Sequence, residues 1–352
     1  MGQKHRIHTW LDLAVEAGFD PFAVPLLADC PANAVRLARG AVEAAAGVAV
    51  PEAAVWSPSS LARILRERKA NAVILVTIRA WHPSVAALGM PILLDHVDEL
   101  SRSYRQRAAL GAPPHRRALN VLLGAAARRL EQRLPPSVTQ VAAGRQDAER
   151  LHATWIPILA PTVQPPGRSD AEHDVVFFGN LSYPPNSDAL DSLAAMWPEV
   201  IRRRPGTTLL VAGRHAERKV RRHAAELGWE LVEDFASLAD ILKRARCAAI
   251  PLRYATGIQN KALEAAAYAL AQIVTPAVMA GLDPAFPVEV SELEYFPERL
   301  TALLDDDERL SRLGDAGRRH VLASYSASSW APTLQRLLAG VDPVPVSATV
   351  EA

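Results

Sequence analysis

RYATGIQNKALEAAAYALAQIVTP occupies residues 253–276 and reads as a loop, a helix and a short strand. The apolar run 247–252 precedes it and is typical of a strand buried in a parallel sheet. Thr256 is an N-cap residue type and Gly257 favours a turn, so we expect the helix to begin here. The first N–H groups of a helix have no partner within it and attract phosphate. The stretch therefore predicts an anion site at the end of a strand.

Two charged side chains lie close to this predicted helix start. Gly257, Lys261 and Glu264 are spaced four and three residues apart, which places them along one helix face. Backbone amides and an ammonium suit the phosphates of a nucleoside diphosphate, and a carboxylate accepts hydrogen bonds from ribose hydroxyls. The alternative is an ordinary Lys–Glu pair on a solvated helix, which contributes little to stability.

The composition narrows the class of protein. A chain of 352 residues is long enough for two domains, each with its own core. With 39 basic and 38 acidic residues the net charge is near zero, and we expect no nucleic-acid partner. Cys30 and Cys247 are too few for a disulfide framework or a thiolate metal site. We expect neither a membrane span nor a signal peptide, which favours a cytoplasmic protein.

Short apolar runs bounded by Pro, Asp or Gly alternate with helical patterns along the whole chain. This alternation predicts an α/β fold with parallel sheets and helices on both faces. The chain begins on a predicted helix, residues 3–17, whereas a doubly wound domain normally begins on a strand, so its first strand is expected to be missing. The predicted strands are residues 22–27, 53–56, 72–78, 91–94, 138–142, 155–159, 174–178, 207–212, 231–235, 247–252 and 272–275.

Two stretches resemble a known family. Residues 253–276, together with FFGNLSYPPNSDAL at residues 177–190, resemble retaining glycosyltransferases of family 4, which have the GT-B fold. LEAAAYALAQIVTP, at residues 263–276, is similar to the family segment LEAMAxGxPVVxTP. The resemblance covers about residues 1–340 and is stronger in the second half. It implies two Rossmann-like domains that face a central cleft.

The resemblance also implies how the domains divide. Residues 1–163 would form the acceptor domain and residues 172–325 the nucleotide-sugar donor domain, joined by a proline-rich linker. Residues 326–340 would form a C-terminal helix that packs back towards the first domain, with Trp330 and Leu334 as packing residues.

The donor site implied by the resemblance lies mostly in the second half. A glycine loop follows the first donor strand, and a nucleobase lies near Phe235. The residues that would contact the donor are Gly179, Asn180, Arg214, Phe235, Thr256, Gly257, Ile258, Lys261 and Glu264. The chain departs from the family pattern because Asn180 and Pro185 stand where a basic pair is usual, and Thr256 stands where the first of two glutamates is usual. Lys261 would supply the missing positive charge.

By resemblance, the chain is a retaining glycosyltransferase that moves a sugar from a nucleoside diphosphate, with UDP as the default, to a hydroxyl acceptor. The leaving phosphate would assist the attack, with the amides of Gly257 and Ile258 and the ammonium of Lys261 stabilising its charge. No DxD pair lies near the phosphate site, so no metal and no cofactor is expected. The alternatives are a nucleotide-sugar epimerase and a non-catalytic nucleotide-sugar-binding protein.

Candidate acceptor residues follow a strand in the first half. The sequence LLDHVDELSRSYR, residues 93–105, is the most polar strand exit there, and ligands of open α/β sheets bind at the carboxyl ends of strands. Asp95, His96 and Asp98 are therefore candidate catalytic or acceptor-binding residues, with His96 as a general base. The alternative is that they are surface or capping residues.

A basic stretch follows. Residues 101–133 contain eight arginines, and their only acidic residue is Glu131. Apolar residues interleave the arginines in an amphipathic pattern over residues 118–134. A solvated helix face would explain this pattern. The other interpretation is a surface that meets anionic lipid headgroups at the inner membrane face, or an anionic or lipid-linked acceptor.

Overall fold

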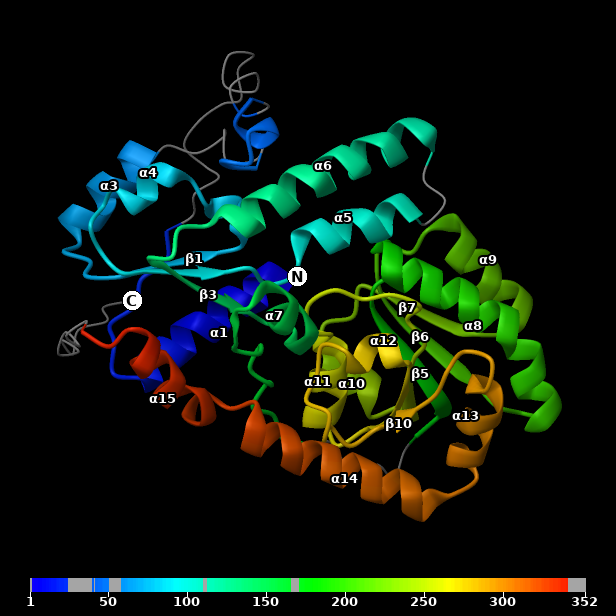
Figure 1. The fold of residues 1–352 in the computed structure, drawn as a ribbon. Helices are drawn as coiled ribbons and strands as arrows, with labels where there is room; N and C mark the ends of the chain where they lie inside the picture. The colour runs from blue at the N-terminus through cyan, green and yellow to red at the C-terminus, as the bar shows by residue number, and fades with distance from the viewer. Residues whose placement is uncertain are drawn as a thin grey trace. The chain divides into compact units, whose positions relative to one another are not determined.

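The computed structural model describes residues 2–24, 40, 42–50, 58–109, 113–165 and 171–340 (Figure 1). The chain divides into two compact units. The N-terminal unit comprises Met1–Ile158 and Ala327–Ala352, and the C-terminal unit comprises Leu159–Ser326. Each unit contains a parallel sheet with helices packed against it, as the alternating pattern predicts.

The sheet of the N-terminal unit has four parallel strands in the order β1-β2-β3-β4. The first three match predicted strands closely, whereas β4 is shorter than predicted and begins one residue earlier. Val76 of β1 pairs with Asp95 of β2, and Asp95 pairs with Val141 of β3, so these strands end at one level. Their bounds are β1 (Val73–Val76), β2 (Ile92–Asp95), β3 (Val138–Ala142) and β4 (Thr154–Trp155).

Both faces of this sheet are buried. Leu93 packs in a cluster with Leu13 and Leu334, whereas Leu94 packs in another with Leu130, because successive strand residues point to opposite faces. The helices are α1 (Gly2–Glu16), α3 (Pro58–Glu67), α4 (Pro83–Ala86), α5 (Leu100–Ala109), α6 (Pro114–Arg133), α7 (Arg145–Leu151) and α15 (Ala327–Leu337), with a 3-10 turn η2 (Ile78–Ala80).

The first helix α1 packs against the last helix α15 and against β1. Gln335 donates a hydrogen bond to the carbonyl of Ala17, at 3.0 Å, and the rings of Trp155 and Trp330 meet edge to face at 5.2 Å. The prediction that Trp330 and Leu334 are packing residues is confirmed. These contacts explain why an N-terminal helix is stable here: its apolar face is covered by residues from the other end of the chain.

Some predicted elements of the N-terminal unit lie outside the described residues. This applies to the strand at 53–56 and to residues 25–27 of the strand at 22–27, while residues 22–24 are not in a strand. Between residues 30 and 46, residue 40 and residues 42–45 are described and are helical.

The sheet of the C-terminal unit has six parallel strands in the order β10-β9-β8-β5-β6-β7. The chain starts in the middle at β5, winds outward through β6 and β7, and then returns to the other side of β5 as β8. This is the strand order of a doubly wound dinucleotide-binding sheet, whose ligand site lies where the winding reverses. The strands are β5 (His173–Asn180), β6 (Leu209–Arg214), β7 (Glu230–Glu233), β8 (Ala245–Ile250), β9 (Ala271–Val274) and β10 (Glu289–Val290).

Seven helices are described in this unit: α8 (Pro184–Arg203), α9 (Arg218–Leu227), α10 (Leu238–Leu242), α11 (Asn260–Ala267), α12 (Pro276–Met279), α13 (Phe296–Leu304) and α14 (Asp307–Ser324). Ser237 caps α10, since its hydroxyl accepts from the Asp240 amide at 3.4 Å. Asn186 and Ser187 are of residue types that often cap helices, but they do not cap α8. That helix starts earlier, after Tyr183, and both residues lie in its first turn.

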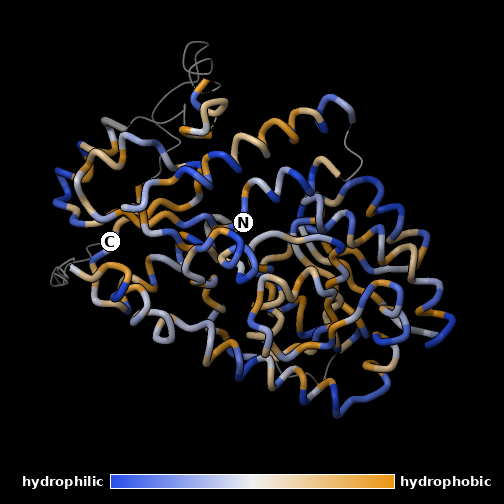
Figure 2. The backbone as a smooth tube through the Cα atoms, in the orientation of Figure 1, coloured by the Kyte–Doolittle hydropathy of each residue, from blue (hydrophilic) through white to orange (hydrophobic). Residues whose placement is uncertain are grey.

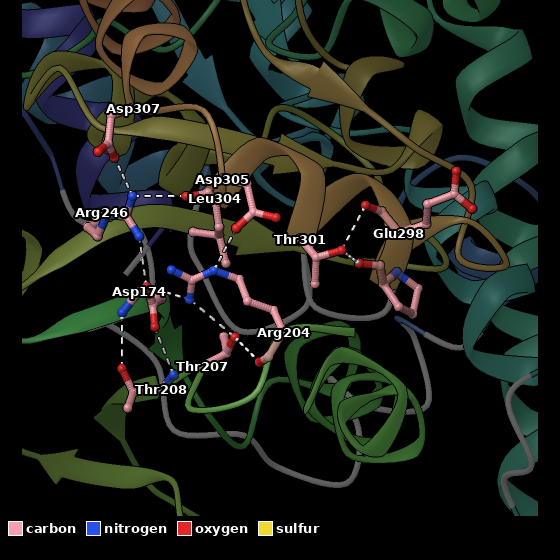
Figure 3. A network of polar contacts seen from close by, with 11 residues as sticks. Asp174, Arg204, Thr207, Thr208, Arg246, Glu298, Thr301, Leu304, Asp305 and Asp307 are labelled. Atoms are coloured by element: carbon pink, nitrogen blue, oxygen red, sulfur yellow. Dashed lines mark hydrogen bonds and ion pairs between the residues drawn. The ribbon is translucent and has the colours of Figure 1, made fainter. Parts of the chain in front are cut away.

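An ion-pair network ties the amino ends of the central strands to the helices (Figure 3). Asp174, at the start of β5, accepts from Arg246 of β8 at 2.8 Å and pairs with Arg204 at 3.0 Å. Arg204 also donates to Asp305 at 3.0 Å, and Arg246 pairs with Asp307. These contacts fix the two central strands at the end opposite to the one where ligands of such sheets bind.

Hydrophobic residues are concentrated on the strands of each unit (Figure 2). Every residue of β2 and of β9 is buried. Among the described residues, no helix combines the length and the apolar character that crossing a membrane requires.

Candidate functional site

The candidate site of the C-terminal unit lies where its winding reverses, at the carboxyl ends of β5 and β8. The backbone is crowded there. Gly179, near the end of β5, has a φ of 139°, and a Cβ built on Gly213 of β6 would lie 1.9 Å from the Gly179 carbonyl oxygen. Only glycine fits at Gly213, so the loop after β5 stays tight against β6. The predicted glycine loop at Gly179 and exposed Asn180 is therefore present.

The helix after β8 begins later than predicted. Thr256 is not its N-cap: α11 begins at Asn260, after Gln259, and no side chain caps it. The reason is the backbone of Gly257, whose φ of 65° is left-handed and cannot belong to an α-helix. A Cβ on Gly281 would lie 2.3 Å from the carbonyl oxygen of Gly257, so the segment before α11 is held closely against the end of α12.

Lys261 lies in the first turn of α11 and is buried, with 7 % of its surface exposed. Its ammonium donates to the side-chain oxygen of Asn186, in α8, at 2.5 Å, and lies 4.4 Å from the centre of the Phe177 ring. Asn186 in turn donates to the carbonyl of Asn180 at 2.8 Å. This chain of contacts joins α11, α8 and the end of β5 around one cation.

No carboxylate of the described residues lies within ion-pair distance of the Lys261 ammonium. Burial lowers the pKa of Lys261 to about 7, and the charge of Glu264 opposes that shift only in part. Burial also raises the pKa of Glu264, which is half-buried one turn further along α11. A lysine in such a place is held without its usual counterion, and an anion bound beside it would restore its charge.

The other predicted donor residues lie around this end of the sheet. Arg214, at the end of β6, is exposed, and its guanidinium is 3.9 Å from the carboxylate of Asp234. Phe235 is half-buried against the core behind β5 and β6. Ile258 is buried, whereas Thr256 is half-buried. The structure thus brings Gly179, Asn180 and Lys261 together, while Arg214 ends β6, Glu264 lies in α11, and Phe235, Thr256, Gly257 and Ile258 lie on the loops after β7 and β8.

Asn186 is the site residue that the sequence did not reveal. Its contact with Lys261 spans 75 residues, and its place in the first turn of α8 resembles that of an ordinary capping residue. A signal was nevertheless present. An asparagine six residues after a strand that ends in Gly-Asn can reach back to that loop, as Asn186 does.

In the N-terminal unit, Asp95 ends β2 and is fully buried. Its carboxylate accepts from the Arg6 guanidinium at 2.5 and 3.1 Å, from the Trp10 indole at 2.7 Å and from the Val97 amide at 3.0 Å. Arg6 is also fully buried and donates to the carbonyl of Pro157 at 2.7 Å. The structure makes Asp95 the buried anchor of α1, because its oxygens already accept hydrogen bonds from the protein, and its predicted catalytic role stays a prediction.

His96 and Asp98 follow Asp95 at the same sheet edge. The His96 ring is buried, its Nε2 lies 3.0 Å from the side-chain oxygen of Gln140, and its Nδ1 has no hydrogen-bond partner. Burial lowers the pKa of His96, so the ring is neutral near pH 7. Val97 between them has a φ of 64°, which is strained for a branched residue, and the Asp98 amide donates to the His96 carbonyl at 2.7 Å. This neutral ring with an unpartnered nitrogen has the chemistry of a hydrogen-bond acceptor.

One group of potential metal ligands occurs among the described residues, at the opposite end of β5. The ligand atoms of Glu172, His173 and Glu230 lie within 4.8 Å of one another. Arg244 donates to Glu172 at 2.8 Å and to Glu230 at 2.7 Å. A guanidinium therefore already neutralises these carboxylates, and the cluster is an ion-pair network.

Comparison with known proteins gives one family match over part of the chain and several structures that share its fold. Residues 172–306 match the family model described as Glycosyl transferases group 1. The sequence has no significant match among curated proteins. Solved structures that share the fold include TarM from S. aureus, with a TM-score of 0.59 and 10 % identity over 80 % of this chain and 58 % of that chain.

HepE from Anabaena, solved with UDP and glucose, has a TM-score of 0.59 and 11 % identity, covering 80 % of this chain and 81 % of that one. A structure of trehalose-6-phosphate synthase has a TM-score of 0.55 and 9 % identity, covering 82 % and 78 %. The chain spans just under three fifths of the length of TarM. Residues 172–306 therefore resemble the glycosyl transferases group 1 family, and the chain shares the GT-B fold of these solved glycosyltransferases.

Proposed function

We propose that the chain transfers a sugar from a nucleoside diphosphate sugar to a hydroxyl acceptor, with the diphosphate bound beside Lys261. The observation that carries this proposal is the buried ammonium of Lys261, which has an amide oxygen and an aromatic ring as neighbours but no carboxylate within ion-pair distance among the described residues. A bound diphosphate supplies the missing negative charge. The structures of HepE contain UDP, which favours uridine as the nucleoside.

The donor residues then have distinct roles. Gly179 allows the diphosphate to approach the backbone after β5, while Asn186 positions the Lys261 ammonium. Glu264, one turn further along α11, accepts hydrogen bonds from the ribose hydroxyls. Phe235, on the loop after β7, contacts the nucleobase, and Arg214, at the end of β6, contacts the phosphates. Asn180, Thr256, Gly257 and Ile258 complete the backbone around the donor.

The chemistry requires no group beyond the two substrates. The bond between the anomeric carbon and the leaving phosphate oxygen breaks, and the acceptor oxygen bonds to the same carbon. The acceptor hydroxyl proton passes to the leaving phosphate, whose charge Lys261 stabilises. We propose that attack occurs on the face that the phosphate leaves, so the anomeric configuration is retained, and that no metal takes part.

For the acceptor we propose the sheet edge of the N-terminal unit at His96 and Asp98. The unpartnered Nδ1 of His96 would accept a hydrogen bond from an acceptor hydroxyl. Asp95 acts there only indirectly, because it fixes the backbone of Val97 through the hydrogen bond from that amide.

The test is turnover of a panel of UDP-sugars, measured as UDP release with and without glycan and lipid-linked acceptors. Lys261→Gln removes the charge, and we expect donor turnover to fall by about 100-fold, as for the loss of one charge-stabilising group. Lys243→Gln is the matched control, since Lys243 is exposed and pairs with Asp240 at 2.7 Å.

Unchanged turnover in Lys261→Gln would contradict the proposed role of Lys261. Donor binding without transfer to any acceptor would instead indicate a nucleotide-sugar-binding protein, and conversion of the donor without an acceptor would indicate an epimerase. Nuclear magnetic resonance of the product tests retention, because an inverted anomeric centre would exclude it.

A further inference from the structure

Helix α6 has two apolar faces. Gly124, Ala127 and Leu130 are buried and form the inner face. Ala118, Val121, Leu122 and Ala125, spaced three, one and three residues apart, lie on the outer side and are all exposed; the exposed fraction is 56 % for Val121 and 69 % for Leu122. This spacing forms one continuous stripe on a helix. Figure 2 shows the hydrophobic stretch in the first half of α6.

Exposed positive charges accompany this outer stripe. Arg107, in the last turn of α5, is exposed and lies over the Tyr104 ring. His115, Arg116 and Arg117 are exposed in the first turns of α6, where there is no acidic residue. Cations at a helix N-terminus are unfavourable because the dipole is positive there. Neither arginine of this first turn pairs with a carboxylate within the described residues, so their charge remains available to a partner.

The surface is supported rigidly. A Cβ on Gly124 would lie 3.3 Å from the Tyr104 Cβ and 3.4 Å from the Ser101 carbonyl, so α5 and α6 pack closely side by side (Figure 1). At the other end of α6, Glu131 accepts from the Ser101 amide at 3.1 Å. The outer face of α6 is therefore presented by a fixed helical hairpin, which we call the α5–α6 hairpin (residues 100–109 and 113–133).

We propose that the α5–α6 hairpin docks on the surface of an anionic lipid bilayer. An apolar stripe with cations beside it matches a bilayer interface, where apolar side chains enter the acyl boundary and arginines meet the lipid phosphates. Charge complementarity favours this partner over a neutral protein surface: His115 and Arg117, which precede Ala118 and Val121 by three and four residues, lie beside the stripe, and no acid lies on it. The proposal does not depend on the transfer reaction.

The experiment is flotation of the full chain with vesicles of phosphatidylcholine alone, or of phosphatidylcholine mixed with phosphatidylglycerol. We expect binding only to the anionic vesicles and weakening at high salt. Arg116→Gln/Arg117→Gln and Val121→Ser/Leu122→Ser should each lower the binding constant at least about tenfold. The matched controls are Arg218→Gln/Arg222→Gln on α9 and Leu322→Ser on α14, whose side chains are also exposed.

Equal binding to both kinds of vesicle, no binding to either, or unchanged binding in both double variants would overturn the proposal. Size-exclusion chromatography with light scattering gives a further outcome. The unaltered chain could be a dimer that does not bind vesicles, with Val121→Ser/Leu122→Ser a monomer. In that case the outer face of α6 binds a second copy of the chain, and the proposed lipid contact is wrong. Circular dichroism checks that the variants are folded, and their UDP release should equal that of the unaltered chain.

Discussion

At the scale of single residues, the buried amine of Lys261 has a cost that can be measured. Its pKa is about 7 in the folded chain and 10.5 in its ordinary state. A lowered pKa means that the stability contribution is present above pH 10.5 and is lost as the pH falls towards 7. Methionine does not titrate, so Lys261→Met avoids this loss. As the pH falls from 9.5 to 7, we expect the unfolding free energy of Lys261→Met to rise relative to that of the unaltered chain by on the order of 3 kcal/mol.

Urea unfolding of both proteins, without nucleotide, measures this difference. Lys243→Met is the control and should show no such trend, because Lys243 is exposed. If the difference in unfolding free energy between Lys261→Met and the unaltered chain stays constant with pH, the Lys261 ammonium is solvated and the predicted effect of its burial is wrong.

Asp95 gives a second prediction at the residue scale. Removing one partner of its fully buried pair with Arg6 leaves an uncompensated charge, so Asp95→Asn should cost about 3–5 kcal/mol of unfolding free energy. Arg6→Met/Asp95→Leu removes both charges and should recover most of that loss. If the double variant is as unstable as Asp95→Asn, the pair is not what anchors α1; if it is stable but inactive, Asp95 also acts in the reaction.

At the scale of elements, the strands were easier to predict than the starts of helices. Strands such as β3 are short apolar runs, and local pattern suffices to find them. The start of α11 was predicted too early because Thr256 and Gly257 are residue types typical of a helix N-terminus. In the structure Gly257 has a left-handed backbone conformation and packs closely against Gly281. The partners of Lys261 and Asp95, 75 and 89 residues away, could not be predicted because nothing in a local pattern encodes them.

The packing of α5 on α6 partly buries Glu131, and we therefore expect the stability of the chain to depend on pH. Burial raises the pKa of Glu131 to about 7, with Glu99 and Asp98 adding to the shift. For a raised pKa, the stability contribution is present below the ordinary value of 4.5 and is lost as the pH rises to 7. Glu131→Gln does not titrate and keeps an oxygen that accepts from the Ser101 amide. Relative to this variant, the unfolding free energy of the unaltered chain should fall by about 2–3 kcal/mol as the pH rises from 4.5 to 7.5.

Urea unfolding across that pH range measures the loss. Glu149→Gln is the control, since Glu149 is an exposed partner of Arg145 in α7 and should show no trend. Parallel pH profiles for the unaltered chain and Glu131→Gln would mean that the Glu131 carboxylate is not desolvated in the hairpin.

At the scale of the whole molecule, the strand–helix alternation predicted an α/β fold with parallel sheets and the chain length predicted two domains, and the structure has two such units. The order of the six strands did not follow from the sequence alone, because helix length does not indicate which strands are neighbours: the 20-residue α8 joins the neighbours β5 and β6, whereas the 5-residue α10 joins β7 and β8, which are not neighbours. That order matters for function. It brings the loop after β5 and the start of α11 to the point where the winding reverses, so that Gly179, Asn186 and Lys261 meet.

The most direct measurement is calorimetric titration of the full chain with UDP at pH 8 in two buffers of different ionisation enthalpy. With a pKa of about 7, the Lys261 amine is mostly uncharged at this pH, and a bound diphosphate would raise that pKa again. We predict uptake of about one proton per UDP in the unaltered chain and in Lys243→Gln. In Lys261→Gln, binding should weaken and the uptake should vanish. UDP binding without proton uptake, or equal binding and uptake in Lys261→Gln, would contradict the diphosphate site proposed here.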